Sequence, residues 1–250
     1  MTKDWPYPRI FAHRGGGKLA PENTLAAIRM GQSLGFRAHE FDVKLSKDRV
    51  AILLHDATLE RTTNGHGRAA DFDYSELAKL DAGEWHSEEF IGEHLPTFER
   101  AARLMRPKET MANVEIKPTP GFEVETGRQV AAEAAALWSG APVQPLLSSF
   151  SFEALMAAKE SAPHLARGWL ADEITEEDWG RLDVLGAVSM HTNHKKLRVP
   201  DIARLKARGY RVLVYTVNEI ETAGRLFAAG VDGIFTDNLR EFAARFPDAI

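Results

Sequence analysis

Short apolar runs alternate with helix-like segments along the whole of this 250-residue chain, and this alternation restricts the fold more than any other feature. Nine runs have the length and composition of β-strands. They are Arg9–Ala12, Ala38–Val43, Val50–Leu54, Ala112–Lys117, Pro145–Ser149, Ala166–Leu170, Ala187–His191, Arg211–Thr216 and Gly233–Thr236. The segments between most of them carry apolar residues at helical spacing, as in 218–230, where Asn218 is the predicted cap and Gly230 the predicted end. Strands that alternate with helices predict an α/β fold with a parallel sheet.

The second and third runs cannot form a parallel pair, because only Lys44–Arg49 separates them. A parallel crossover needs about a dozen residues or more, so this short link predicts a β-hairpin. Eight parallel strands remain, and they predict a single (β/α)8 TIM barrel domain over residues 1–250. The polar and aromatic stretch at about 56–94 is a predicted insertion after the second barrel strand. An open doubly wound sheet is the alternative, but the glycines at 15–17 lack the spacing of a dinucleotide fingerprint.

The charge and composition of the chain exclude several classes of protein. The formal net charge is -5 and the isoelectric point is near 6.0, so the chain has no basic footprint for nucleic acid. No apolar run approaches the ~20 residues that span a bilayer, so we expect no stable membrane insertion. Residues 1–9 lack the apolar core of a signal peptide, which predicts a cytoplasmic protein. The absence of cysteine excludes disulfides, thiolate metal sites and a cysteine nucleophile.

A histidine and an arginine end the first predicted strand, directly before a glycine-rich turn. His13 offers an imidazole that titrates near neutral pH, and Arg14 offers a guanidinium that can fork onto phosphate oxygens. The glycines at 15–17 allow the backbone to approach a ligand closely. The segment therefore predicts a phosphate-binding junction between strand and helix. The alternative is an ordinary strand end and turn. Asn23 or Thr24 is the predicted cap of the first helix.

Three carboxylates are predicted to point into the barrel. Glu40 and Asp42 lie two residues apart on one strand, so their side chains share a face. Glu115 and Lys117 repeat this arrangement on a later strand. Three inward carboxylates suit a hard divalent cation, Mg²⁺ or Ca²⁺, better than zinc. A salt-bridged strand end without metal is the alternative for the first two acids, and Lys117 can neutralise Glu115, contact a phosphate, or do both.

A second histidine, His55, closes the returning arm of the predicted hairpin. With the hairpin turn centred near Lys47, antiparallel pairing places His55 level with Glu40 and so in the same site. Two histidines that flank a phosphodiester can act as general base and general acid, each contributing about 10²- to 10⁴-fold in rate. His191 ends a predicted strand and is a candidate for a supporting role. The other histidines are expected to be structural or solvated: His39, His66, His86, His94, His164 and His194.

Several further side chains receive structural interpretations. Arg61 and its neighbours are expected to order the insertion rather than touch phosphate. Trp169 and Tyr215 can line a substrate mouth, although aromatic residues on strands usually belong to the core. Asp237 follows the last strand and can hydrogen-bond the site or cap the final helix, and the helix role is the preferred interpretation.

Taken together, the motifs of this chain resemble the glycerophosphodiester phosphodiesterase family, in its bacterial cytoplasmic form. The first group of matching motifs comprises His13–Gly15, Pro21–Thr24, Glu40–Val43, His55–Asp56, Arg61–Gly65 and Val114–Lys117. The match continues through Leu80–Gly83, Leu95–Glu99, Ser148–Phe150, Tyr215–Asn218 and Gly230–Asp237, and so covers nearly the whole chain. Tyr215 stands where the family often has tryptophan, a difference that bears on the surface meeting the alcohol half of a substrate.

The resemblance implies a barrel related to phosphoinositide-specific phospholipase C and one divalent cation. It also implies hydrolysis of a small-molecule substrate, a glycerophosphodiester, to sn-glycerol 3-phosphate and an alcohol. The nucleophile is either water or the glycerol hydroxyl of the substrate, which forms a cyclic phosphate first. A lysophospholipase D and a phosphate-binding protein without catalysis are the alternative functions. The site residues implied are His13 and His55 as acid and base, Glu40, Asp42 and Glu115 as metal ligands, and Arg14 and Lys117 as phosphate contacts.

Overall fold

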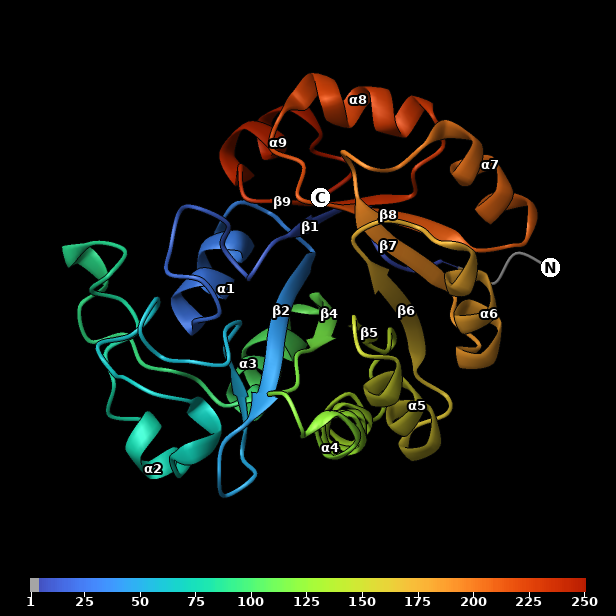
Figure 1. Ribbon diagram of the computed structural model, residues 1–250. Coiled ribbons are helices and arrows are strands. Elements are labelled where there is room, and N and C mark those ends of the chain that lie inside the picture. Colours follow the sequence, from blue (N-terminus) through green and yellow to red (C-terminus); the bar gives the residue numbers. More distant parts are fainter. Residues whose placement is uncertain (1–4) are drawn as a thin grey trace.

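The computed structural model describes residues 5–250, and its central feature is a closed barrel of eight parallel strands (Figure 1). Around the barrel the order is β1, β2, β4, β5, β6, β7, β8 and β9, and β9 pairs again with β1. The strands are β1 Ile10–Ala12, β2 Ala38–Leu45, β4 Met111–Ile116, β5 Leu146–Ser149, β6 Ala166–Ala171, β7 Ser189–Asn193, β8 Arg211–Tyr215 and β9 Gly233–Thr236. The predicted TIM barrel is therefore confirmed.

The ninth strand, β3 (Ala51–Leu53), runs antiparallel to the carboxyl end of β2 and is not one of the eight barrel strands, as the short link predicted. Its register differs from the prediction by one residue. Val43 pairs with Leu53 and Leu45 with Ala51, so the turn is centred at Asp48, and His55 comes level with Phe41 rather than with Glu40. Hydrogen bonds within the turn set this register, because the Ser46 amide donates to the Val50 carbonyl and the Ser46 hydroxyl donates to Asp48.

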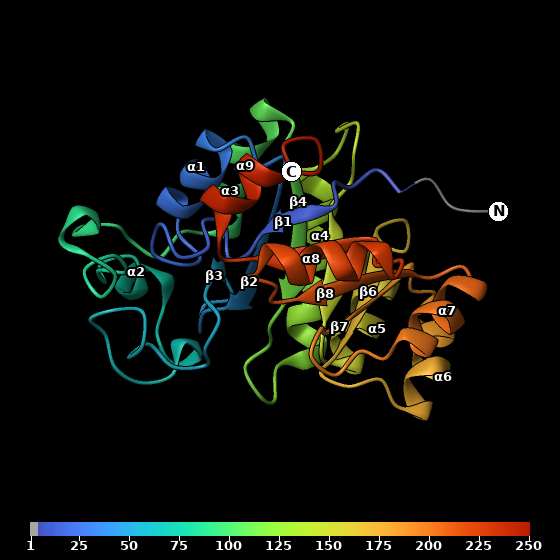
Figure 2. The ribbon, with the colours of Figure 1, turned by 90° about the horizontal axis from the view of Figure 1, so that it is seen from above.

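Helices pack around the strands and cover the outer face of the barrel (Figures 1 and 2). They are α1 Leu25–Ser33, α3 Phe98–Met105, α4 Glu123–Leu137, α5 Phe152–Ser161, α6 Glu176–Leu185, α7 Val199–Ala207, α8 Ile220–Ala228 and α9 Leu239–Arg245. Thr24 caps α1, since its hydroxyl accepts from the Ala27 amide at 3.1 Å. The prediction that Asn218 caps α8 is wrong. Glu219 occupies that position, and Asn218 bonds elsewhere.

The apolar core has an outer layer and an inner plug. Phe41, Val43 and Val114 point outward from the strands and are fully buried against the helices. Fully burying one such side chain contributes about 1.5–3 kcal/mol. Inside the barrel, side chains such as Phe11 and Leu213 form a separate apolar cluster. This plug fills the lower barrel, so polar residues further along the strands line its carboxyl-terminal mouth, where TIM barrels place their sites.

The segment between β3 and α3 is an insertion that lies to one side of the barrel (Figures 1 and 2). It contains α2 (Tyr74–Leu77) and the 3₁₀ turns Ala69–Asp71 and Glu88–Phe90. A small apolar cluster seats it on β3, formed by Ile52, Leu54, Leu59, Ala69, Leu77, Ala82 and Leu95. The insertion also contacts the β1–α1 loop, because the His86 ring nitrogen Nε2 lies 3.1 Å from the Lys18 carbonyl oxygen. It therefore connects the hairpin to the loop that carries His13.

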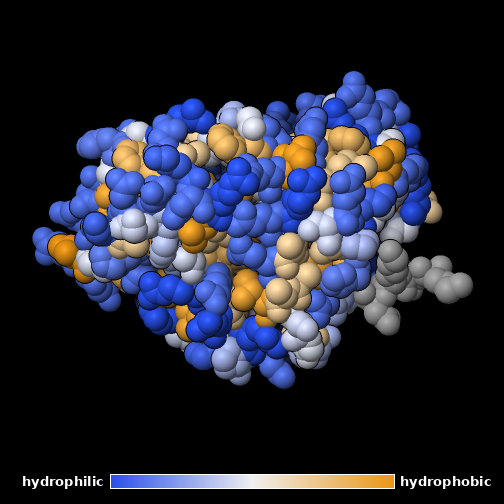
Figure 3. Space-filling model, turned by 90° about the horizontal axis from the view of Figure 1, so that it is seen from below, coloured by the Kyte–Doolittle hydropathy of each residue, from blue (hydrophilic) through white to orange (hydrophobic). Residues whose placement is uncertain are grey.

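The surface is mostly hydrophilic where Figure 3 shows it, and the apolar side chains there are scattered among polar ones. The large apolar side chains exposed on the described part of the chain are Trp85, Ile91, Phe122, Val124, Phe150, Val184 and Val199. Within residues 5–250, every helix is too short or too polar to cross a bilayer.

Candidate active site

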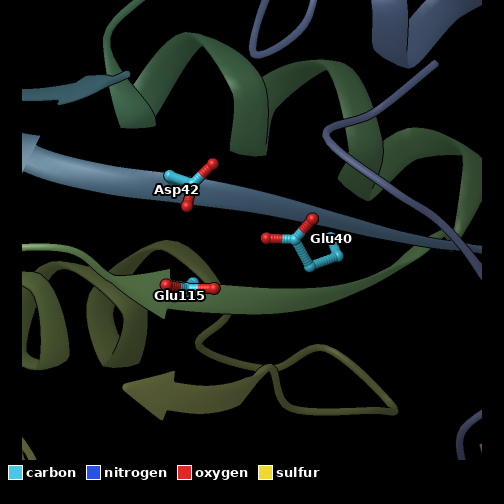
Figure 4. A group of neighbouring side chains, drawn as sticks. All are labelled: Glu40, Asp42 and Glu115. Carbon is cyan, nitrogen blue, oxygen red and sulfur yellow. The ribbon is translucent and has the colours of Figure 1, made fainter. Parts of the chain in front are cut away.

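Three carboxylates converge at the mouth of the barrel, between β2 and β4 (Figure 4). Glu40 and Asp42 share the inner face of β2, and the parallel register places Asp42 beside Glu115 of β4. Their side chains each offer an oxygen, and these oxygens lie within 4.8 Å of one another. Glu40 is 4% exposed and Asp42 is 1% exposed. The predicted inward set is thus brought together in one buried cluster.

The three acids perturb one another because they are buried together. Burial, with the charge of Asp42, raises the pKa of Glu40 to about 8. The same two causes raise the pKa of Glu115. Burial opposes ionisation of Asp42 as well, but the charges of His55 and Lys117 lower its pKa below the ordinary value. A cluster of this kind gains from a cation, and its all-oxygen donor set fits Mg²⁺ or Ca²⁺.

His13 follows β1, and a carboxylate from the opposite end of the chain fixes its ring. Its Nδ1 lies 2.6 Å from Asp237 Oδ1, and its Nε2 lies 3.8 Å from Glu40 Oε2. Asn218 holds Asp237 in turn, donating from Nδ2 to Oδ2 at 2.9 Å. Burial opposes protonation of His13, but its bond to Asp237 and the charge of Glu40 raise its pKa above the ordinary value. Of the two roles open to Asp237, the structure shows the hydrogen bond in the site, and Asn238 rather than Asp237 precedes α9 as its cap, so the preferred interpretation is wrong.

His55 has a matching arrangement on the other side of the acids. Its Nδ1 lies 2.6 Å from Asp56 Oδ1, and Arg61 donates from Nε to Asp56 Oδ2 at 2.6 Å. The buried Lys44 ammonium donates to the His55 carbonyl at 2.9 Å and so fixes its backbone. Burial lowers the pKa of His55, and the attraction of Asp42 offsets only part of this effect. Each of the two predicted histidines thus has Nδ1 on a carboxylate.

Both predicted cations, Arg14 and Lys117, lie in the site. Arg14 donates from Nη1 to Glu22 Oε1 at 2.7 Å, and its backbone amide donates to Glu40 at 2.9 Å. Lys117 donates to Glu115 at 2.6 Å. Arg61 donates to Glu22 as well, so Arg61 does more than order the insertion. It joins the insertion to the β1–α1 loop through a chain of charges.

Asn23 is a site residue that sequence reasoning missed. Its Nδ2 donates to Asp42 Oδ2 at 2.9 Å, and its Oδ1 accepts from the Asp42 amide at 3.0 Å. It adopts the left-handed conformation, with φ of 59°, which asparagine tolerates better than most residues. Thr24 supplies the helix cap, so the polar side chain of Asn23 is not needed for capping. A second capping-type residue beside the cap was the available signal that Asn23 has another partner.

Gly17 allows the β1–α1 loop to touch the end of β9. A Cβ atom at this position would lie 2.3 Å from the Asp237 carbonyl oxygen, and φ is +57°. Glycine is thus required here for a close backbone approach, which keeps His13 beside Asp237.

Two of the remaining predicted residues line the site and two belong to the core. His39 is fully buried on the outer face of β2, with Nδ1 3.0 Å from the Gly15 carbonyl oxygen. Trp169 is buried among the helices, where its indole donates to Asp178 at 2.7 Å. Tyr215 and His191 instead line a cavity of about 210 Å³ that contains both histidines of the acid/base prediction and the three acids.

Two larger openings flank this inner cavity. A groove of about 1030 Å³ lies on the His55 side, with Lys117 and Phe150 in its walls. A smaller opening of about 380 Å³ lies on the His13 side, bordered by Trp85 and Glu22. A ligand longer than the inner cavity thus has an exit on either side.

Comparisons with known proteins identify close relatives. Residues 13–241 match the model of the glycerophosphoryl diester phosphodiesterase family. A glycerophosphodiester phosphodiesterase from Caldanaerobacter subterraneus subsp. tengcongensis is 36% identical over 230 residues, which cover 92% of this chain and 93% of the relative. A phosphodiesterase from Oleispira antarctica, solved in complex with the product sn-glycerol-3-phosphate, has a TM-score of 0.90. It is 33% identical, and the match covers 97% of this chain and 98% of that one. A glycerophosphodiester phosphodiesterase structure from Agrobacterium tumefaciens has a TM-score of 0.79, 30% identity, and coverage of 95% and 99%.

Proposed function

This chain belongs to the glycerophosphoryl diester phosphodiesterase family and is an enzyme of that activity; we propose that it acts with a divalent cation and two histidines. The products would be sn-glycerol 3-phosphate, which is bound in the Oleispira antarctica relative, and an alcohol. The observation that carries the proposal is the arrangement of the site. Two histidines, each fixed by a carboxylate, flank three buried acids at the mouth of the barrel.

The cation would be held by Glu40, Asp42 and Glu115. Their oxygens lie within 4.8 Å of one another, and the raised pKa values of the two glutamates reflect burial of like charges that a cation relieves. Mg²⁺ and Ca²⁺ both prefer such oxygen ligands. When bound, the cation supplies positive charge to the phosphate oxygens. Asn23 orients Asp42 for this role through its two hydrogen bonds.

The two histidines would divide the proton transfers. A carboxylate at Nδ1 keeps the Nδ1 proton in place and leaves Nε2 to accept or donate a proton. One histidine takes the proton of the nucleophile, and the other gives a proton to the oxygen of the leaving alcohol. Asp237 and Asp56 fix the rings of His13 and His55 while this happens.

Arg14 and Lys117 would bind the phosphate. Arg14 already donates to Glu22 and Lys117 to Glu115, and both also lie within 4 Å of Asp42, so the two side chains are positioned before a substrate arrives. A phosphodiester at the three acids would meet both cations, and their charge would offset the negative charge that develops in the transition state.

The test is release of sn-glycerol 3-phosphate from several glycerophosphodiesters, with Mg²⁺, Ca²⁺ or a chelator. We expect His13→Ala and His55→Ala each to lose about 10²- to 10⁴-fold in kcat. The exposed His164 supplies the matched control, and His164→Ala should keep wild-type kcat. Full activity of either site variant would refute the two-histidine mechanism, and full activity after complete metal removal would refute the cation.

The same preparation distinguishes the remaining alternatives. Faster release from a lysophospholipid than from glycerophosphocholine would favour a lysophospholipase D. No turnover of any diester by folded, metal-loaded protein would favour a binding protein. A cyclic glycerol phosphate trapped by rapid quench would identify the substrate's own hydroxyl as the nucleophile.

A further inference from the structure

The inner cavity has an uncharged wall that the proposed chemistry does not use. Asn113 of β4, His191 of β7 and Tyr215 of β8 line it, together with the histidines and acids of the site. Asn113 is 2% exposed and His191 is fully buried. The three side chains come from widely separated parts of the chain, and the barrel brings them to one cavity of about 210 Å³.

Each of these side chains has one polar atom that pairs with no protein group among residues 5–250. These atoms are Asn113 Oδ1, His191 Nδ1 and the Tyr215 hydroxyl. The opposite ends of two of the side chains are fixed: Asn113 donates from Nδ2 to Ser148 at 2.9 Å, and His191 Nε2 lies 2.9 Å from the Ser189 hydroxyl. Burying a polar atom without a partner is costly, so atoms in this position point to a ligand that supplies partners.

The neighbouring strand makes room for the imidazole. A Cβ atom on Gly168 of β6 would lie 2.4 Å from His191 Nε2, so a larger residue there would displace the ring. Burial lowers the pKa of His191 to about 3, and the ring is therefore neutral at physiological pH. These three side chains offer hydrogen bonds without charge, whereas the acids, Arg14 and Lys117, which line the same cavity, are charged groups. The two kinds of group adjoin, because Asn113 pairs with Glu40 in the register of β4 and β2.

We propose that Asn113, His191 and Tyr215 bind the hydroxyl groups of the glycerol half of the substrate. This assignment rests on the proposed function, and it names the half of the diester that enters the barrel. It places Tyr215 on the glycerol half, and not on the alcohol half expected from the sequence. A hydroxyl both donates and accepts, so it can pair with an amide oxygen, a phenol, or an imidazole nitrogen in either tautomer. A glycerol phosphate carries both a charged phosphate and uncharged hydroxyls, and the lining of this cavity offers partners of both kinds. A fatty acyl chain in place of a hydroxyl brings no donor for Asn113 Oδ1.

Calorimetric binding to the metal-loaded wild-type protein tests the assignment directly. The two ligands are sn-glycerol 3-phosphate and propyl phosphate, which has the same phosphate and carbon chain without the hydroxyls. We expect the glycerol phosphate to bind about tenfold more tightly or better, because each hydroxyl pairs with a group that is otherwise unsatisfied. Equal affinities would overturn the assignment, and they are the expected result if water alone satisfies the wall.

Two variants locate the preference on the wall. Tyr215→Phe removes a single atom, and His191→Phe removes the ring nitrogens while keeping a planar side chain. Both should shrink the affinity ratio between the two ligands several-fold. Thr192→Val is the matched control, because Thr192 is buried on the outward face of the same strand as His191. If the ratio is unchanged in Tyr215→Phe and in folded His191→Phe, or falls equally in the control, the assignment is wrong.

Turnover of glycerophosphocholine, measured in parallel, separates this inference from the proposed function. Preference for glycerol phosphate without turnover would support the hydroxyl-binding assignment and refute the proposed function. Turnover without the preference would support the proposed function and refute the assignment.

Discussion

Replacing Glu40 by glutamine tests whether the buried acids lower the stability of the fold while they serve catalysis. The amide of Glu40→Gln has the same shape and keeps an oxygen that can accept the Arg14 amide, which donates to Glu40 at 2.9 Å. It carries no charge, however, and so ends the repulsion that burial and Asp42 impose on this position. We expect the variant to lose activity and, without metal, to be more stable than the wild type.

The size of the effect follows from the pKa of Glu40, which is about 8 in the folded protein against an ordinary value of 4.5. Because the folded pKa is the higher one, the folded state binds more protons between these two pH values, and its stability falls as pH rises through this window. At pH 7 the raised pKa of Glu40 makes the free energy of unfolding of the wild type about 3 kcal/mol smaller than it is at low pH, where Glu40 is protonated in both states. For a chain of this size, that difference corresponds to roughly 6–12 °C in Tm.

Thermal unfolding in chelator at pH 5, 7 and 8 measures this difference. The Tm of Glu40→Gln should exceed that of the wild type, and the gap should widen with pH. Added Mg²⁺ or Ca²⁺ should then stabilise the wild type more than the variant, because the ion binds only the folded site. Glu99 is exposed, and Glu99→Gln serves as the control with no such gap. A lower Tm for Glu40→Gln in chelator at pH 8, or a gap independent of pH, would refute the reasoning.

Three other outcomes follow from the geometry. Asn23→Ala removes both hydrogen bonds to Asp42, so we expect about 2 kcal/mol less stability in urea unfolding and at least tenfold weaker metal binding by titration. A variant with wild-type metal affinity would contradict this. His191 has a folded pKa of about 3, below its unfolded value, so the stability that it contributes above pH ~6.5 is lost as pH falls, by about 2 kcal/mol at pH 5. Urea unfolding of wild type and His191→Phe should show a steeper acid loss for the wild type, and equal slopes would count against it. Gly17→Ala should lower both stability, by about 2 kcal/mol or more, and kcat, because its Cβ meets the backbone that follows β9. Gly121 also has a positive φ, but a Cβ atom there would meet no other atom, so Gly121→Ala is the control. A similar loss of kcat in Gly121→Ala would argue against the role of the contact between Gly17 and Asp237.

Features with a strong local pattern could be predicted from the sequence. The alternation of strand and helix was enough for the barrel, because eight strands joined by crossovers have few ways to close. The period-two rule was enough to place Glu40, Asp42 and Glu115 together, since each lies on the polar face of a buried strand. In both cases the information lies in adjacent residues.

Features set by partners distant in the sequence could not be predicted. Asp237 precedes a helix, and this local position favoured a role at the start of the helix. Its actual partner, His13, lies 224 positions away in the sequence, so the sequence pattern gave no indication of the bond. Asn23 stands beside a good helix cap, so its contacts with Asp42 were hidden in the same way. The predicted hairpin register was wrong by one residue, because the length of the link does not determine it. The hydrogen bond from the Ser46 hydroxyl to Asp48 in the turn sets the register instead.

The bond between His13 and Asp237 also determines when the site becomes complete. The three acids all lie within the first half of the chain, between Glu40 and Glu115, and their strands are direct neighbours. The orientation of His13, in contrast, needs β9 to dock against β1, where Ile10 pairs with Ile234. β9 is the last strand to be synthesised, so the partner that orients His13 is also the last part of the site to leave the ribosome. A nascent or truncated chain without β9 lacks the carboxylate that orients His13. If His13 acts as proposed, such a chain is inactive until its last strand is in place.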